Sequence, residues 1–144
     1  MKISTKTRYG LRAMLDLAVN SAHPPVSLSE IAKRQDISEN YLEQIFSALR
    51  KAKLVKSVKG ASGGYVLVPD PQDIRVIDII SELEGELAII GDSAEDSSNP
   101  IRQCLKEYLW DVFEDRLYTV LSGITLKDLA DEYRHMCSPH MFYI

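Results

Sequence analysis

Hydrogen-bonding and basic side chains gather on one face of a predicted helix over residues 39–52. The helix is expected because apolar side chains recur at every third or fourth position. Its other face carries Asn40, Glu43, Gln44, Ser47, Arg50 and Lys51. Amide and carboxylate groups can bond the edges of bases, and cationic groups can bond phosphates. These residue types at this spacing therefore favour recognition of a polar, anionic partner.

Imidazole and thiol groups near the C-terminus form a second candidate site. His135, Cys137 and His140 follow the pattern H-x-C-x₂-H, and both side-chain types suit zinc or iron. Metal sites usually take ligands from two separated segments. A tail in which these residues occur by chance therefore stays open as the alternative.

Catalytic motifs are missing from the sequence. No nucleophile is paired with a base, and no HExxH zinc motif is present. Gly60, Gly63 and Gly64 lie in a predicted hairpin rather than before a helix, so they do not form a phosphate-binding loop. The chain is therefore not expected to be an enzyme.

A helix-turn-helix is predicted to position the polar face. Ser27 and Glu30 have the spacing of a capping box, which predicts a short helix that stops near residue 36. Ser38 offers an N-cap for the helix over 39–52. An ordinary corner between two helices has the same spacing, so this pattern alone does not separate the two interpretations.

The segment after this helix predicts a β-hairpin. Residues 54–58 alternate with period two, residues 59–64 are rich in glycine, and residues 65–68 form a second apolar run. A hairpin directly after the second helix is a wing. Its basic residues are Lys51, Lys53, Lys56 and Lys59. A solvated charged face is the alternative, but the wing and the polar helix together favour DNA binding.

Charge is distributed unevenly along the 144 residues. Through residue 68 there are eleven basic and five acidic side chains, a net of +6. From Pro69 onward there are six basic and sixteen acidic side chains, a net of −10, which gives −4 in all. The basic half is suited to an anionic partner. With no long apolar run, no secretory signal and two cysteines, a cytoplasmic protein with no membrane segment is expected.

The acidic half is predicted to contain a long helix over residues 101–121, which is too apolar for a small domain to cover. The simplest explanation is dimerisation, and packing within the chain is the alternative. Thr125 and Asp128 predict the cap of a last helix over 126–136. The predicted organisation is a winged helix-turn-helix domain (1–84), a regulatory loop (85–100) and a dimerisation helix with C-terminal segment (101–144). The fold class is mainly α with a small β-hairpin wing (α+β).

Four segments resemble the Rrf-type winged helix-turn-helix transcription regulators of bacteria, a family that includes IscR-, NsrR- and CymR-like proteins. These segments are MKISTK (1–6) with RYG (8–10), ISENYLEQ (37–44), GASGGY (60–65) and ITLKDL (124–129). The resemblance covers nearly the whole chain. It implies a homodimer whose long helices cross, with each head on one half of a palindromic operator, acting as a repressor.

The resemblance also implies roles for single residues. The residues that would lie at the major groove are Ser38, Asn40, Tyr41, Glu43 and Gln44. Lys59 would reach the minor groove from the wing. The residues expected to hold phosphates are Arg8, Arg50, Lys51 and Lys56.

Cluster-binding members of the family carry three cysteines around the loop before the long helix, and in IscR-like members a histidine three residues after the last cysteine completes the ligands. This chain keeps only Cys104; the other positions fall near Asp92, Ser98 and Glu107. No cofactor is therefore expected, because iron–sulfur clusters require thiolates. An iron–sulfur cluster with unusual ligands stays open as an alternative.

Two further interpretations of Cys104 stay open. It is a small buried residue of the long helix, or a redox-sensing thiol whose pKa is lowered by Arg102 or Lys106. The final residues MFYI (141–144) resemble the end of CymR-like repressors, which lack a cluster and respond through a cysteine-synthesis enzyme. This likeness favours control of sulfur metabolism through a partner enzyme. A winged-helix module that binds a protein is the alternative from another class.

Overall fold

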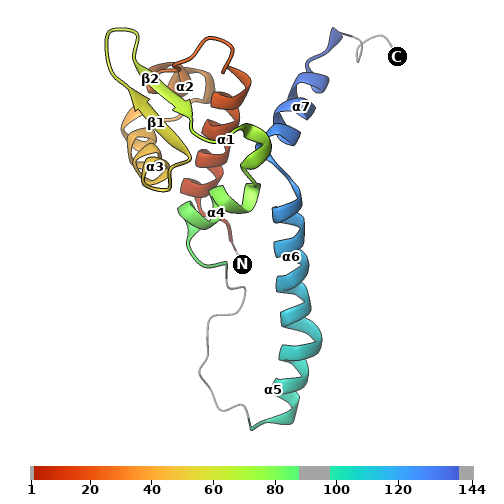
Figure 1. Ribbon diagram of the computed structural model, residues 1–144. Coiled ribbons are helices and arrows are strands. Elements are labelled where there is room, and N and C mark those ends of the chain that lie inside the picture. Colours follow the sequence, from red (N-terminus) through yellow and green to blue (C-terminus); the bar gives the residue numbers. More distant parts are fainter. Residues whose placement is uncertain (1, 88–97, 140–144) are drawn as a thin grey trace.

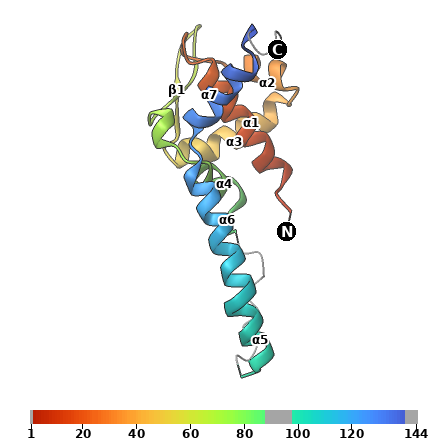
Figure 2. The same ribbon diagram turned by 90° about the vertical axis from the view of Figure 1, so that its right-hand side faces the viewer.

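The chain folds into a helical head from which a long helical rod projects (Figures 1 and 2). The computed structural model describes residues 2–87 and 98–139. The head contains α1 (Thr5–Val19), α2 (Leu28–Gln35), α3 (Glu39–Lys51), β1 (Val55–Val58), β2 (Gly64–Leu67), η1 (Pro71–Asp73) and α4 (Val76–Glu84). The rod comprises α5 (Pro100–Leu105), the π-helical turn η2 (Lys106–Trp110) and α6 (Asp111–Gly123), and α7 (Leu126–Met136) follows. The predicted fold class is confirmed.

Side-chain caps explain where the helices of the head begin. In α2 the amide of Glu30 donates to Ser27 Oγ at 3.1 Å, and the amide of Ser27 donates to the Glu30 carboxylate at 2.9 Å. At the start of α3, Ser38 Oγ accepts from the amide of Tyr41 at 3.2 Å. The predicted capping box and the second predicted N-cap are confirmed. They fix the tight turn that joins α2 to α3.

Helix α1 packs against α2, α3, α4 and α7 and so lies in the middle of the head. The apolar faces of these helices meet in one core. Its largest fully buried side chains are Met14, Leu17, Ile31, Leu42, Ile45, Phe46, Leu49, Ile74, Ile79 and Leu126. Burial of this apolar surface is the main stabilising contribution to the head.

Helix α7 returns to the head after the rod and packs against α1. A short antiparallel bridge holds the junction: the amide of Val76 donates to the carbonyl of Ile124 at 2.9 Å, and the amide of Leu126 donates to that of Ile74 at 2.8 Å. Leu126 and Ala130 are consequently buried in the core of the head. The division into 1–84, 85–100 and 101–144 stays a prediction. Most of its loop, residues 88–97, lies outside the described residues.

The rod runs from Pro100 to Gly123 and contains a π-helical turn in place of one uninterrupted α-helix. Asn99 caps it, because its side-chain oxygen accepts from the amide of Ile101 at 3.0 Å. Across η2 the amide of Asp111 donates to the carbonyl of Lys106, which is the five-residue step of a π-helix, and Lys106 Nζ lies 2.9 Å from the Asp111 carboxylate. No helix in the described ranges is long and apolar enough to cross a membrane.

Candidate nucleic-acid interface

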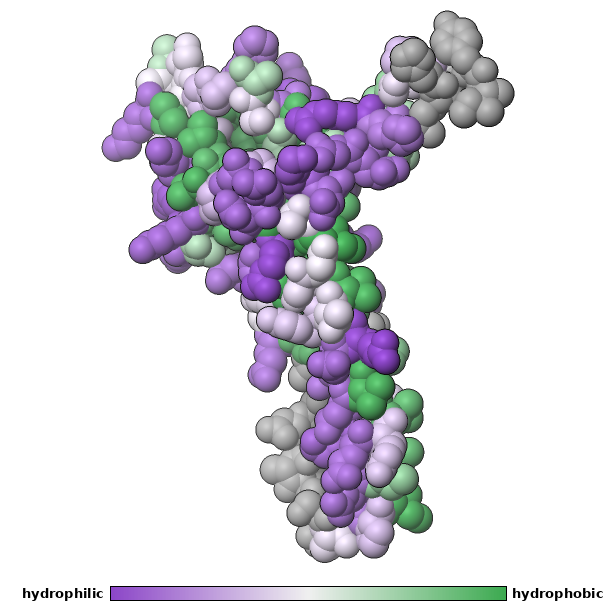
Figure 3. All heavy atoms as spheres, turned by 45° about the vertical axis from the view of Figure 1, so that its right-hand side comes forward, coloured by the Kyte–Doolittle hydropathy of each residue, from purple (hydrophilic) through white to green (hydrophobic). Residues whose placement is uncertain are grey.

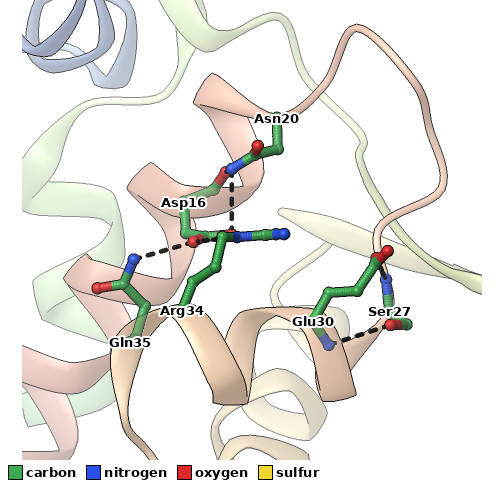
Figure 4. Close-up of polar contacts among 6 residues, drawn as sticks. All are labelled: Asp16, Asn20, Ser27, Glu30, Arg34 and Gln35. Atoms are coloured by element: carbon green, nitrogen blue, oxygen red, sulfur yellow. Dashed lines mark hydrogen bonds and ion pairs between the residues drawn. The ribbon is translucent and has the colours of Figure 1, made fainter. Parts of the chain in front are cut away.

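A buried carboxylate fixes α2 against α1 (Figure 4). Asp16 is 3% exposed, and its oxygens accept from Arg34 Nε at 2.9 Å, Arg34 Nη2 at 2.8 Å and Gln35 Nε2 at 2.9 Å. The hydrogen bond to Asp16 raises the pKa of Arg34, so the guanidinium stays charged. Asn20 Nδ2 donates to the Asp16 backbone carbonyl at 2.8 Å. Because a buried charge is stable only when it is paired, this cluster sets the orientation of α2.

A second contact holds the turn of the helix-turn-helix. Arg12 donates to the carbonyl of Gln35, and its guanidinium carbon lies 5.1 Å from the centre of the Tyr9 ring. The Tyr9 ring meets Tyr41 edge-on with 5.8 Å between centroids. Asp36 closes α2 in the left-handed conformation, with φ 54°. These contacts hold the first turn of α3 in place, and they leave the Tyr41 side chain half-buried.

The outward face of α3 is a shallow, open hollow lined by Asn40, Glu43, Gln44 and Ser47. The first three of these side chains are exposed and Ser47 is half-buried. Their spacing of three and four residues places them on one side of the helix. Ser38, at the start of this face, uses its hydroxyl oxygen as the N-cap. The sequence-predicted base-contacting residues therefore lie together at one end of the head.

The wing is docked onto the head at its base. Its strands pair in register from Val55 with Leu67 to Val58 with Gly64. The amides of Val26 and Tyr65 each donate to the other's carbonyl, at 3.0 and 2.7 Å. The Tyr65 ring lies 4.8 Å from that of Phe46.

Gly64 makes this docking possible, because a Cβ at this position would lie 2.4 Å from the Val26 carbonyl oxygen. A side chain there would push the wing away from the segment before α2. The glycine-rich stretch that predicts a turn thus also contains a position where two backbones approach closely.

The cations around α3 and the wing have no acidic partner among the residues that the structure describes. Arg50, Lys51, Lys56 and Lys59 are exposed, and the described residues supply no ion pair to any of them. Arg8 is also exposed, and it donates to Thr5 Oγ1 at 3.1 Å. In the acidic half, by contrast, the cations with ion pairs include Arg75, Lys106, Lys127 and Arg134. Unpaired cations beside a polar hollow form a surface suited to a phosphate backbone.

Sequence reasoning missed the residues that position this surface, Arg12, Asp16 and Arg34. They bond between helices and not to the outward face of α3, although the Arg12 and Arg34 side chains are themselves exposed. Asp16 carried a usable signal, because an acid within the apolar stripe of an amphipathic helix is rarely buried without a partner.

The described thiols do not form a cluster site. Cys104 is exposed on α5, so the interpretation of a small residue buried within this chain is wrong. At the position where the family can carry a histidine, Glu107 accepts from Gln103 Nε2 at 2.9 Å. The described ranges contain no group of three or more His, Cys, Asp or Glu side chains placed to hold a metal. A single thiolate does not fit an iron–sulfur cluster.

The C-terminal metal candidate is only partly described. His135 and Cys137 are exposed at the end of α7, whereas His140 lies outside the described residues, as does Asp92. The side chain of Cys137 raises the pKa of Tyr133 through a hydrogen bond. The H-x-C-x₂-H site stays a prediction.

A helix-turn-helix followed by a docked, lysine-bearing hairpin defines a winged-helix DNA-binding protein. The Rrf2 family, described as an iron-dependent transcriptional regulator, matches residues 3–132. The chain belongs to this family of transcriptional regulators, which confirms the family that the sequence motifs predicted.

Two relatives and one solved structure define the likeness. The transcriptional regulator CymR of Bacillus subtilis is 44% identical over 144 residues, the full length of both chains. IscR of Escherichia coli is 41% identical over 131 residues, which cover 91% of this chain and 81% of that protein. The solved structure of CymR, titled the global cysteine regulator of B. subtilis, superposes with a TM-score of 0.80 at 43% identity. It covers 92% of this chain and 98% of that one.

Proposed function

We propose that the chain is a homodimeric repressor that binds a palindromic operator in the cytoplasm. Each head would place α3 in the major groove and the wing at the minor groove. The observation that carries this proposal is the exposed polar face of α3 beside a docked wing whose lysines have no ion pair among the described residues. The family is one of transcriptional regulators, so this activity, and not catalysis, is the proposed role.

Base recognition is assigned to the hollow on α3. Gln44 can bond adenine with both ends of its amide, and Glu43 can accept from the amino group of cytosine. Asn40, Ser38 and Tyr41 would complete this set from the first turn of the helix. The residues assigned to phosphates are Arg8, Arg50, Lys51 and Lys56, with Lys59 at the minor groove.

A second copy of the chain is proposed to cover the rod. Leu105, Leu109 and Phe113 are each nearly half exposed although they are apolar, and the core of the head is already complete without them. A helical rod of this length spans about 36 Å. Buried apolar surface along this length is the usual driving force for an obligate pair.

The regulated process is proposed to be cysteine or sulfur metabolism. The full-length likeness to CymR supports it, as does the lack of a thiolate set around Cys104 in the described residues. Control through a partner enzyme follows from the same likeness. Anaerobic purification with an iron count tests the alternative of an iron–sulfur sensor like IscR. A coloured, iron-bearing dimer would overturn the cluster-free proposal.

Binding isotherms at several salt concentrations test the DNA-binding surface. A duplex selected from a random pool and its scrambled version serve as ligands. Glu43→Ala should change the preferred sequence, whereas Lys56→Ala should weaken both duplexes alike and flatten the salt dependence. Lys127→Ala is the matched control, because this lysine pairs with Asp131 on α7 and should leave binding unchanged. An unchanged salt slope for Lys56→Ala would remove its phosphate role.

A further inference from the structure

Backbone hydrogen bonds close the turn at the C-terminal end of helix α3. Beyond the C-cap Ala52, the amide of Lys53 donates to the carbonyl of Arg50 at 3.0 Å. The amide of Leu54 donates to the carbonyl of Leu49, also at 3.0 Å, and both leucines belong to the core of the head. This is the Schellman pattern, in which the residue after the C-cap adopts the left-handed conformation and is usually glycine.

In this chain that position is occupied by Lys53, with φ 60°. A side chain disfavours the left-handed conformation because its Cβ crowds the following carbonyl, and glycine avoids this cost. In the described ranges only Lys53 and Asp36 combine a side chain with a positive φ, and they flank α3 on either side. Asp residues adopt the left-handed conformation comparatively readily, whereas lysine has no local hydrogen bond that favours it.

The surroundings of Lys53 indicate what its side chain is for. It is exposed, and within the part of the chain that the structure describes it has no ion pair and no side-chain hydrogen bond. It comes two residues after Lys51, which lies eleven residues after Asn40 and hence on the same side of α3 as the polar hollow. Arg50 and Lys56, exposed and equally unpaired, lie close in sequence on either side.

We infer that Lys53 is a DNA-phosphate contact that anchors the C-terminal end of α3 to the backbone of the duplex. This inference rests on the proposed function of α3. Backbone strain that persists at a functional surface is typically offset by a contact made there. A lysine in this left-handed turn extends the row of proposed phosphate-binding residues past the end of α3. If residue 53 continued the α-helical conformation, the helical rotation about the axis of α3 would turn its side chain away from that row. The competing explanation is a purely structural role, in which the charge interacts with the helix C-terminus.

Three substitutions separate these explanations. Lys53→Gly removes both the charge and the strain, Lys53→Asn removes the charge with a residue that tolerates this conformation, and Lys53→Arg keeps both. We expect Lys53→Gly to raise the melting temperature. We also expect Lys53→Gly and Lys53→Asn to weaken binding to specific and scrambled duplexes alike. The slope of log K against log salt should fall by about 1.8 for a dimer, which loses two contacts of about 0.9 each. Lys53→Arg should bind as the original protein does.

The measurements are thermal melting and fluorescence anisotropy of a labelled duplex at four or more salt concentrations. The inference is overturned if Lys53→Gly and Lys53→Asn keep the original slope and affinity while Lys56→Ala flattens the slope. The proposed function would stand in that case. If the unmodified protein itself shows no salt-dependent DNA binding, the proposed function fails, and the inference fails with it.

Discussion

The carboxylate of Asp16 lies between α1 and α2 and bonds to two side chains of α2. It touches none of the residues assigned to DNA. It nevertheless sets the orientation of α2 relative to α1, and so also the position of the turn that leads into α3. Arg12 supports the same turn by donating a hydrogen bond to the carbonyl of Gln35. At the scale of single residues, the recognition surface therefore depends on side chains that would never appear in a list of DNA contacts.

Asp16→Asn tests this dependence. The substitution keeps the volume of the side chain but removes the charge that Arg34 and Gln35 bond. We expect the free energy of unfolding, measured with urea, to fall by about 2 kcal/mol, because hydrogen bonds to a charged group are lost in a buried place. DNA affinity of the folded variant should fall for all sequences. Asp131→Asn is the control: its pairs with Lys127 and Arg134 are exposed, and such pairs contribute about 0–1 kcal/mol. Equal stability of the two variants would contradict the role of Asp16.

At the scale of elements, those defined by neighbouring residues were predictable from the sequence. The capping pairs Ser27 with Glu30 and Thr125 with Asp128 gave the starts of α2 and α7 because a cap needs only residues three apart. The exposed face of α3 was predictable for a similar reason, since exposure follows the phase of the helix. Periodicity does not say which neighbour covers an apolar face. For that reason the packing of α7 on α1 and the inter-helix contacts of Asp16 were not foreseen.

Helices α1 and α4 are joined by a polar latch at the base of the head. The carboxylate of Glu84 accepts from Thr7 Oγ1, from Ser4 Oγ at 2.7 Å and from the amide of Ser4 at 3.1 Å. These hydrogen bonds, that of Thr7 first and those of Ser4 next, hold the pKa of Glu84 below its ordinary value. A lowered pKa means that the folded state favours the charged form. The latch therefore stabilises the fold at neutral pH.

The latch predicts a pH-dependent difference between the original protein and Glu84→Gln. Above the ordinary carboxyl pKa of 4.5 the stabilisation is complete, so the original protein should melt at a higher temperature than the variant. As the pH falls through the lowered pKa of the folded state the carboxylate is protonated, and the difference should shrink. Melting curves between pH 7 and pH 3 measure it. Glu82→Gln, on an exposed position of α4, should show no such convergence. A Glu84→Gln difference independent of pH would contradict the latch.

At the scale of the whole molecule, the two charged halves occupy different places. The excess of positive charge belongs to α1–α3 and the wing. The negative excess belongs mainly to residues 69–99, which have one basic and nine acidic side chains, whereas the rod (100–123) has three basic and four acidic side chains. In Figure 1 the wing and α7 lie on opposite sides of the head. The positive excess is therefore suited to attracting a duplex to the proposed face formed by α3 and the wing, whereas the nearly neutral rod provides no such attraction.

The π-helical turn aligns the apolar side of the rod. Its apolar side chains recur at four-residue steps, at Ile101, Leu105, Leu109, Phe113 and Leu117. In a regular α-helix each such step advances by about 40°, so the last would lie about 160° from the first. A π-helical turn absorbs one extra residue and takes back about 100° of this drift. Figure 3 shows hydrophobic residues along one side of the rod over its length, with hydrophilic residues beside them.

This alignment predicts how the proposed dimer responds to changes in length. Deleting Glu107 from the π-helical turn leaves a regular α-helix with the same alignment, so the dimer should persist. Inserting one alanine between Arg116 and Leu117 rotates the end of the stripe by about 100° and should raise the dimer dissociation constant at least tenfold. Sedimentation over a dilution series measures both constants, and thermal melting of each variant controls for folding. A dimer that survives the insertion and dissociates on the deletion would show that the π-helical turn serves another purpose. If the operator has the two halves proposed above, the insertion should also reduce the preference for a palindromic duplex over a single half-site.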